Sequence, residues 1–234
     1  MFYYLTAFLC AITGNFKDFL IFSLIIIIHE IGHVIFALYY KWNIDKVILL
    51  PFGALTLFNE QINRPLFEEF VILVMGPIFQ TVFTFLFCFN YSIIEYSKII
   101  LFFNLLPIYP LDGSKLLNII LNKFISFKKS HLITLYVSIL VVLFILAYVK
   151  FNLILVFIFS FIIFKILEEF KNHKSLFNKF LLERYLYNFN FKKKKTINSY
   201  KNMQRDYKHL FKIGNTYKTE NEFLKEMFDF KRKI

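Results

Sequence analysis

Two histidines and a glutamate lie within an otherwise apolar stretch, in the motif His29-Glu30-Ile31-Gly32-His33. Residues four apart share one face of an α-helix, so His29 and His33 can direct their ring nitrogens at one point. Imidazole is a common zinc ligand, and a glutamate beside it can take a proton from water as a general base. The spacing therefore predicts half of a catalytic metal site. The alternative interpretation is that three polar side chains solvate one another inside a helix bundle. This interpretation is weak, because ionisable groups are costly in a membrane segment and usually mark a functional site there.

A catalytic zinc site needs a third protein ligand and leaves one position for water. Asp112 is the only Asp in a predicted membrane segment, and Pro107 and Pro110 break the helix before it. Gly113 lets the backbone come close, so a carboxylate can be presented at depth. Asp112 also fits the N-terminal cap of a helix over 113–122. Taken alone, the two interpretations are equal; beside the histidine pair, ligation is the stronger.

The apolar composition determines which elements position these residues. Of the 234 residues, 58% are hydrophobic and 21% are aromatic, which leaves too little polar sequence to cover a soluble fold. We expect an all-α polytopic membrane protein of about six transmembrane helices, with a re-entrant β-hairpin-like segment and a short basic cytoplasmic tail. The spans are predicted over residues 2–13, 19–40, 66–89, 99–121, 132–149 and 151–167.

The cations are distributed unevenly between the predicted loops. Six crossings place both termini on one side, and by the positive-inside rule this side is the cytoplasm. It holds Lys41, Lys46, Arg64, Lys123, Lys128, Lys129 and the cations of the tail, whereas the other side holds Lys17, Lys98 and Lys150.

Residues 43–64 differ from the spans, because β-branched residues surround Pro51-Phe52-Gly53 and predict two short strands about a bend. Non-helical backbone at membrane depth persists only when it is buried in protein or lines a wet cavity. A re-entrant hairpin and an ordinary surface loop are equally good interpretations.

Asn104 is expected to donate a hydrogen bond to substrate or to a developing oxyanion, with a bond between helices as its alternative.

More than half of the 28 Lys and Arg residues follow the last apolar run. We therefore divide the chain into a membrane domain, 1–168, and a basic cytoplasmic tail, 169–234. His209 is expected to be solvated, and the run Lys192-Lys193-Lys194-Lys195 to be solvated or lipid-facing. Residues 202–234 are expected to form an amphipathic helix. Nucleic acid is not an expected partner, because no fold signature accompanies the charge.

Together these motifs resemble the site-2 protease family of intramembrane zinc metalloproteases, in particular its sporulation branch. The resemblance covers residues 4–187 and implies one Zn²⁺ per chain, held by His29, His33 and Asp112, with Glu30 as the catalytic base. It also implies substrate contacts at Asn104, Pro107 and a hairpin around Phe52 and Gly53. The stretches that carry it are His29-Glu30-Ile31-Gly32-His33, Asn104-Leu105-Leu106-Pro107 and Leu111-Asp112-Gly113, supported by Leu50-Pro51-Phe52-Gly53, Gly76-Pro77 and Phe180-Leu181-Leu182-Glu183-Arg184-Tyr185.

The resemblance further implies a zinc metalloendopeptidase that cleaves a membrane-associated pro-sigma factor, in the mother-cell membrane around the forespore. Inhibitory membrane proteins, membrane lipid and further copies of the chain are additional expected partners. Two departures stand out. Many members carry Asn where this chain has Gln80, so Gln80 is given no catalytic role. The residues after Tyr187 are too few for the complete CBS domain in which this branch typically ends.

Two functions of other classes stay open. A membrane zinc transporter also buries histidines and acidic groups, but it needs a polar path on both sides of the site. A catalytically inactive membrane scaffold would retain a partner without cleaving it, although the intact His29, Glu30, His33 and Asp112 argue against decay.

Overall fold

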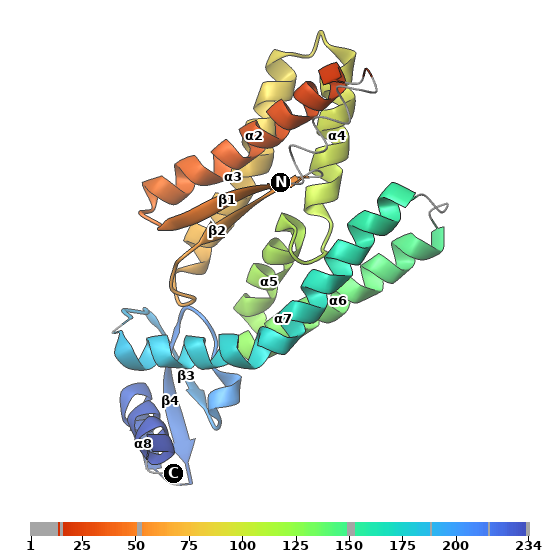
Figure 1. Cartoon of the computed structure of the whole chain (residues 1–234). Coiled ribbons are helices and arrows are strands. Elements are labelled where there is room, and N and C mark those ends of the chain that lie inside the picture. The colour runs from red at the N-terminus through yellow and green to blue at the C-terminus, as the bar shows by residue number, and fades with distance from the viewer. Residues whose placement is uncertain are drawn as a thin grey trace. The chain divides into compact units, whose positions relative to one another are not determined.

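The computed structural model describes residues 14, 16–50, 53–148, 153–187, 189–214 and 216–232. These residues are mostly helical, as predicted, with two small sheets (Figure 1). The predicted first span and Phe52 lie outside the described residues. The elements are α2 (Phe16–Tyr39), β1 (Ile44–Leu50), β2 (Gly53–Phe58), α3 (Leu66–Leu86), α4 (Tyr91–Leu105), α5 (Asp112–Phe124), α6 (Phe127–Tyr148), α7 (Leu153–Leu186), β3 (Lys193–Ile197), the 3-10 helix η1 (Tyr200–Asn202), β4 (Tyr207–Ile213), β5 (Thr216–Thr219) and α8 (Glu220–Arg232).

Within the described ranges, three helices are long and apolar enough to cross a membrane: α2, α3 and α6. The predicted fourth span is two shorter helices instead of one. α4 ends at Leu105 and α5 begins at Asp112, because the two prolines between them cannot continue a helix. Asn90 starts α4 earlier than predicted, since its side chain accepts a hydrogen bond from the Ser92 N–H at the helix N-terminus.

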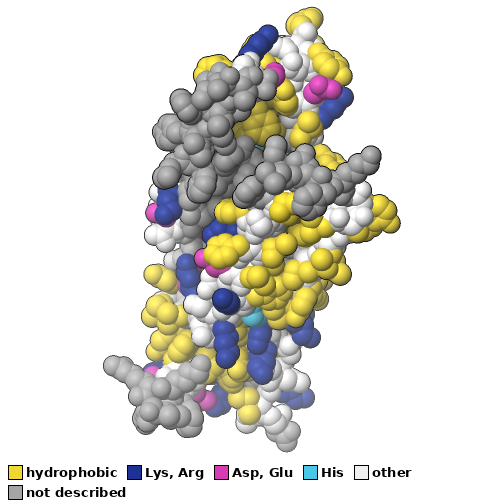
Figure 2. All heavy atoms as spheres, turned by 45° about the vertical axis from the view of Figure 1, so that its right-hand side comes forward, with side chains coloured by type: hydrophobic (Ala, Val, Ile, Leu, Met, Phe, Trp, Pro, Cys, Tyr) yellow, Lys and Arg dark blue, Asp and Glu magenta, His cyan; other side chains and the backbone are white. Residues whose placement is uncertain are grey.

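Apolar side chains on the helix surfaces agree with a membrane location. Along α6, Tyr136, Leu140 and Phe144 are each about three-fifths exposed, at 59%, 65% and 63%. Figure 2 shows a broad area of exposed hydrophobic side chains on the face turned toward the viewer. An apolar area of this size needs lipid or protein to cover it. In a membrane protein, the bilayer provides that cover.

The chain divides into two compact units. The first contains α2, β1, β2, α4, nearly all of α3, and the start of α5 as far as Gly113. Its α2–α4 core packs Ile25 and Ile26 against Ile93 and Ile100. The strands β1 and β2 form an antiparallel hairpin that pairs Leu50 with Gly53, which confirms the two predicted strands. The depth of the hairpin in a membrane stays a prediction.

The second unit contains α6, α7 and all elements after them. Its sheet has the order β3-β4-β5, with β3 parallel and β5 antiparallel to β4. The core joins Phe180 of α7 and Met203 to Phe211 of β4 and Leu224 of α8, all fully buried. Burying each such side chain contributes about 1.5–3 kcal/mol, which explains why this basic segment folds.

This sheet corrects two expectations for the tail. The lysine run is exposed, as predicted, and lies partly in β3. Residues 207–219 form strands, so the predicted amphipathic helix is limited to α8. His209, which was expected to be solvated, is fully buried. The alternation of buried and exposed side chains along β4 is hard to read from the sequence, because lysines dominate this stretch. The proposed division at 168/169 lies inside α7, which continues to Leu186.

Candidate metal and catalytic centre

The helix α2 places His29, Glu30 and His33 in the interior of the first unit. Their exposed fractions are 1%, 8% and 4%. One ligand atom from each lies within 4.8 Å of the other two, a spacing that can hold a metal ion. The two imidazole rings have centroids 4.8 Å apart and are tilted by 76°. Local helical spacing alone therefore brings two nitrogen donors and a carboxylate together.

Asp112 meets this cluster from α5. Its Oδ2 atom lies 3.1 Å from His29 Nε2 and 3.1 Å from His33 Nε2. The break between α4 and α5 positions this carboxylate, and the turn is tight there: a Cβ at Gly113 would collide with the Leu105 carbonyl oxygen. The structure thus brings together the three predicted ligands, although Asp112 is 83 residues from His29 in sequence.

The other ring nitrogens determine what the cluster can bind. His33 Nδ1 lies 2.8 Å from the Ile72 carbonyl oxygen, which can only accept, so Nδ1 carries the hydrogen. His29 Nδ1 lies 2.8 Å from Gln80 Oε1, which is likewise an acceptor. With the tautomers assigned in this way, both Nε2 atoms present lone pairs toward the same carboxylate oxygen. With these tautomers, three acceptor atoms converge on one point, an arrangement that suits a bound cation.

Gln80 is the residue whose contribution sequence reasoning missed. It is fully buried on α3. Its amide nitrogen donates to the Ser97 carbonyl oxygen at 2.8 Å and to Ser97 Oγ at 3.0 Å, which leaves Oε1 to accept from His29. Partners of this kind fix the tautomer and orientation of a metal-binding histidine. A buried amide one turn after Gly76-Pro77, in an apolar span, was the available signal.

A glycine in α3 makes room for the second histidine. A Cβ built on Gly76 would collide with the imidazole ring of His33, at Nε2, Cε1 and Cδ2. Only a glycine allows the backbone of α3 to lie against this ring. The packing of α3 against the metal centre therefore explains the glycine of the Gly76-Pro77 motif.

Comparisons with known proteins identify this arrangement. Residues 18–95 match the model of Peptidase family M50. The chain is 36% identical over 199 residues to stage IV sporulation protein FB of Bacillus subtilis. The aligned region covers 79% of this chain and 69% of that protein. The chain belongs to peptidase family M50, the site-2 proteases. It is an intramembrane zinc metalloprotease and an integral membrane protein.

A curated protein and a solved structure from Methanocaldococcus jannaschii are also similar to this protease. The zinc metalloprotease MJ0392 is 25% identical over 64% of this chain and 48% of its own length. The solved structure of a site-2 protease has a TM-score of 0.56 and 23% identity, and the match covers 71% of this chain and 85% of that one. This last similarity shows that the fold is shared.

The donor set suits the zinc that this family uses. Two neutral imidazoles and one carboxylate are the ligand types found in catalytic zinc sites, which keep a fourth position for water. Asn104 of α4 lies at the edge of the cluster, with its amide nitrogen 3.5 Å from His29 Nε2.

The remaining predicted substrate residues lie in different places in this M50 peptidase. Gly53 is the first residue of β2 and pairs with Leu50. The Pro107 carbonyl oxygen belongs to the second unit, where it accepts a hydrogen bond from Ser138 Oγ at 3.2 Å. Phe52 lies outside the described residues.

Proposed function

We propose that this protease hydrolyses a peptide bond in a membrane-associated pro-sigma factor during sporulation. The observation that carries the proposal is the convergence of His29, His33 and Asp112 on one point with Glu30 in the same cluster. The substrate class is supported by the similarity to a sporulation protein of Bacillus subtilis.

The residues take separate roles. His29, His33 and Asp112 would hold the zinc ion. When bound there, zinc would act as a Lewis acid and lower the pKa of a water molecule attached to it. Glu30 takes a proton from the attacking water and returns it to the leaving amine, as general base and then general acid. The Asn104 amide donates to the oxygen on which negative charge develops. Burial of Glu30 strengthens these interactions by excluding bulk water.

The β1–β2 hairpin is the proposed docking element for the substrate backbone. A helical substrate hides its carbonyl groups in internal hydrogen bonds, so it must unwind before attack. In the described residues the hairpin is a sheet of two strands, and an extended peptide can add to its edge beside Gly53. Phe52 and Pro107 complete the proposed substrate contacts.

The membrane arrangement is part of the proposal. We infer six membrane-spanning segments with both termini in the cytoplasm, a membrane part that ends near residue 168, and a location in the mother-cell membrane around the forespore. The three apolar helices α2, α3 and α6 support a multi-pass topology. Inhibitory membrane proteins and self-association are proposed as means of control.

Co-expression with a candidate pro-sigma factor tests the proposal, with a size shift of the substrate on a gel as the readout. Glu30→Gln removes the base and keeps the size of the side chain, so cleavage should be lost while zinc is retained. Glu95→Gln, an exposed glutamate on α4, is the matched control and should cleave normally. Substantial cleavage by Glu30→Gln would remove Glu30 from its role, and an uncleaved substrate with the wild type would reject this substrate class.

A further inference from the structure

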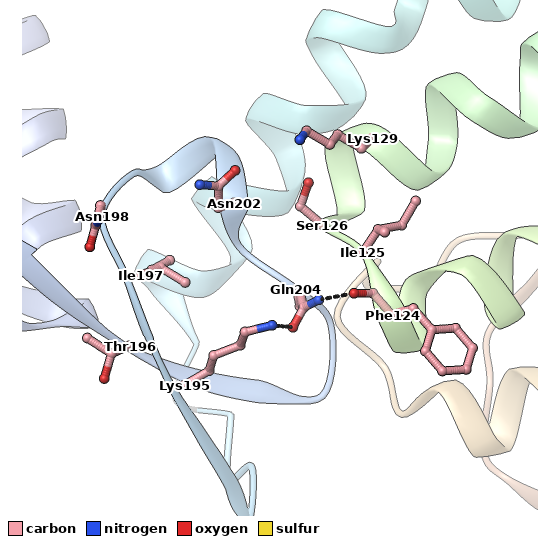
Figure 3. A pocket seen from close by; sticks show the side chains of 10 residues that line it. All are labelled: Phe124, Ile125, Ser126, Lys129, Lys195, Thr196, Ile197, Asn198, Asn202 and Gln204. Carbon is pink, nitrogen blue, oxygen red and sulfur yellow. Dashed lines mark hydrogen bonds between the residues drawn. The ribbon is translucent and has the colours of Figure 1, made fainter.

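A cleft of about 370 Å³ in the second unit has no part in the metal centre (Figure 3). One wall is the chain leading into α6, with Ser126 and Lys129, and the other is β3 with η1, including Lys195 and Asn202. Two ammonium groups line the cleft together with hydroxyl and amide groups. No acidic side chain from the described residues lines it. Its chemistry therefore suits an anion.

The hydroxyl of Ser126 is buried and lacks a hydrogen-bond partner among the described residues. Ser126 directly precedes α6 and is 6% exposed. A serine at this position usually accepts a hydrogen bond from an N–H of the first helical turn. In the described part of the chain, however, Ser126 Oγ has no hydrogen-bond partner. A buried hydroxyl without a partner is costly, and here it lies on the wall of the cleft.

The helix itself adds donors at the same place. The Phe127 N–H is used, because it donates to the Met203 carbonyl oxygen at 3.0 Å. The N–H groups of Lys128 and Lys129 belong to the first turn of α6, where no acceptor within the helix exists. α6 has 22 residues, so its N-terminus carries the positive end of a long helix dipole.

The opposite wall holds its cation in a fixed position. Lys195 Nζ donates to Gln204 Oε1 at 2.9 Å, and Gln204 Nε2 donates to the Phe124 carbonyl oxygen at 3.0 Å. Figure 3 shows this chain of hydrogen bonds across the floor of the cleft, with the side chains of Ser126, Lys129 and Asn202 above it. A ligand in the cleft would meet positive charge from both walls.

We propose that this cleft binds a phosphate group. Phosphate has more acceptor oxygens than a carboxylate, and it matches a cleft that is lined by two lysines, a serine and amide side chains at the N-terminus of α6. α6 is apolar and long enough to cross a membrane and begins at Phe127, so the headgroup of an anionic lipid can present the phosphate at the membrane surface. A soluble phosphate ester can present the same group.

Binding experiments on the full chain in nanodiscs distinguish these two sources. In phosphatidylcholine nanodiscs, calorimetric titration with inorganic pyrophosphate tests the soluble source. In nanodiscs of phosphatidylcholine with phosphatidic acid, native mass spectrometry of retained phosphatidic acid tests the lipid source. We expect at least one probe to bind the wild type.

Three variants locate the binding. Lys129→Gln removes one charge from the wall and should weaken binding about tenfold, as for the loss of one charge-assisted hydrogen bond. Ser126→Asp keeps a good helix cap but adds a negative charge in the cleft, so it should weaken binding further. Lys201→Gln is the matched control, since Lys201 is an exposed lysine of η1 that does not line the cleft.

The outcomes separate clearly. Pyrophosphate binding that both cleft variants weaken supports the site with a soluble ligand, and retention of phosphatidic acid with the same dependence supports it with a lipid. The proposal is overturned if neither probe binds, if the cleft variants bind as the wild type does, or if Lys201→Gln weakens binding as much as Lys129→Gln. Lys129 is exposed, so its variant keeps the test valid if Ser126→Asp fails to fold.

Discussion

The metal centre and the C-terminal sheet of this protease both contain buried histidines, and the ring nitrogens have different surroundings in the two regions. In the C-terminal sheet, His209 Nδ1 lies 3.3 Å from a Glu220 oxygen, and Nε2 accepts from the Gln204 N–H at 3.1 Å. Every nitrogen of this ring has a partner of the right kind. In the metal centre, the Nδ1 atoms are also satisfied, but both Nε2 atoms face a carboxylate oxygen that has no hydrogen to give.

The difference extends to charge. In the C-terminal region the protein supplies its own cation, because the buried Arg184 donates to Glu220 at 3.2 Å and to the carbonyl oxygens of Tyr207 and Gln204. The metal centre instead collects acceptors around one point. A structural network of buried polar groups is complete by itself, whereas a functional one is completed by its ligand. Substitutions in the two regions should therefore fail in different ways.

The largest expected effect is on the metal centre. Asp112→Asn keeps the shape of the side chain and removes the charge, so zinc affinity should fall by more than about 100-fold, beyond the loss typical of outer hydrogen-bond partners. The zinc content of the protein after dialysis against a chelator measures this loss of affinity. Asp229→Asn, an exposed residue of α8, is the control. Unchanged zinc content in Asp112→Asn would mean that another residue is the third ligand.

The next effect is on the C-terminal network. Arg184→Met keeps the apolar stem but leaves Glu220 buried without its cation, which should destabilise this region by about 3–5 kcal/mol. Hydrogen exchange of the β4 amides in the full chain measures the loss. Zinc content should stay normal if the two regions are independent. Lys208→Met, on an exposed position of β4, is the matched control.

A smaller effect is expected from the positioning residue of the metal centre. Gln80→Leu removes the acceptor for His29 Nδ1–H, so the ring loses its fixed tautomer and zinc affinity should fall about 10–100-fold. Gln80→Glu retains an acceptor there and should keep more of the zinc. Equal zinc affinity in both variants and the wild type would show that Gln80 only fills space.

The smallest effect depends on pH. Burial lowers the pKa of His209, and Arg184 and Lys195 add to this, against the opposing effect of Glu220. The folded state therefore favours the neutral ring. The contribution of His209 to the free energy of unfolding is present above the ordinary pKa of 6.5. It is lost as pH falls below this value, by at most about 1.4 kcal/mol per pH unit.

Exchange of the β4 amides at pH 7.5 and 5.5 measures this loss. In His209→Gln, the pH dependence of stability in this window should become flatter. Glu220 acts in a separate window: burial opposes ionisation, but His209 and Arg184 outweigh it and hold the pKa of Glu220 below 4.5. Its contribution is therefore lost only in stronger acid. An identical pH dependence in His209→Gln and the wild type would contradict the role of His209.

The metal centre was predictable in part. Helical periodicity is local, so the spacing of His29 and His33 indicates a shared face without knowledge of the fold. Asp112 was a candidate because two prolines and a glycine surround it in an apolar segment. Gln80 was missed because its contact with His29 joins residues 51 positions apart on two different helices.

The tail was less predictable than the spans. Long apolar runs identify membrane helices by composition alone, and α2, α3 and α6 were all predicted. The strands β3, β4 and β5 are short and rich in lysine, so their identity depends on apolar side chains that are buried by α7 and α8.

The sequence by itself determined the membrane class of the protein and the pair of histidines on one helical face, because hydropathy and helical spacing are local properties. Only the tertiary structure decided which atoms meet that pair: a carboxylate from beyond a helix break, an amide from Gln80 and a carbonyl from Ile72. These contacts join distant parts of the chain, and their geometry is set by the packing of helices against one another, which no local pattern specifies.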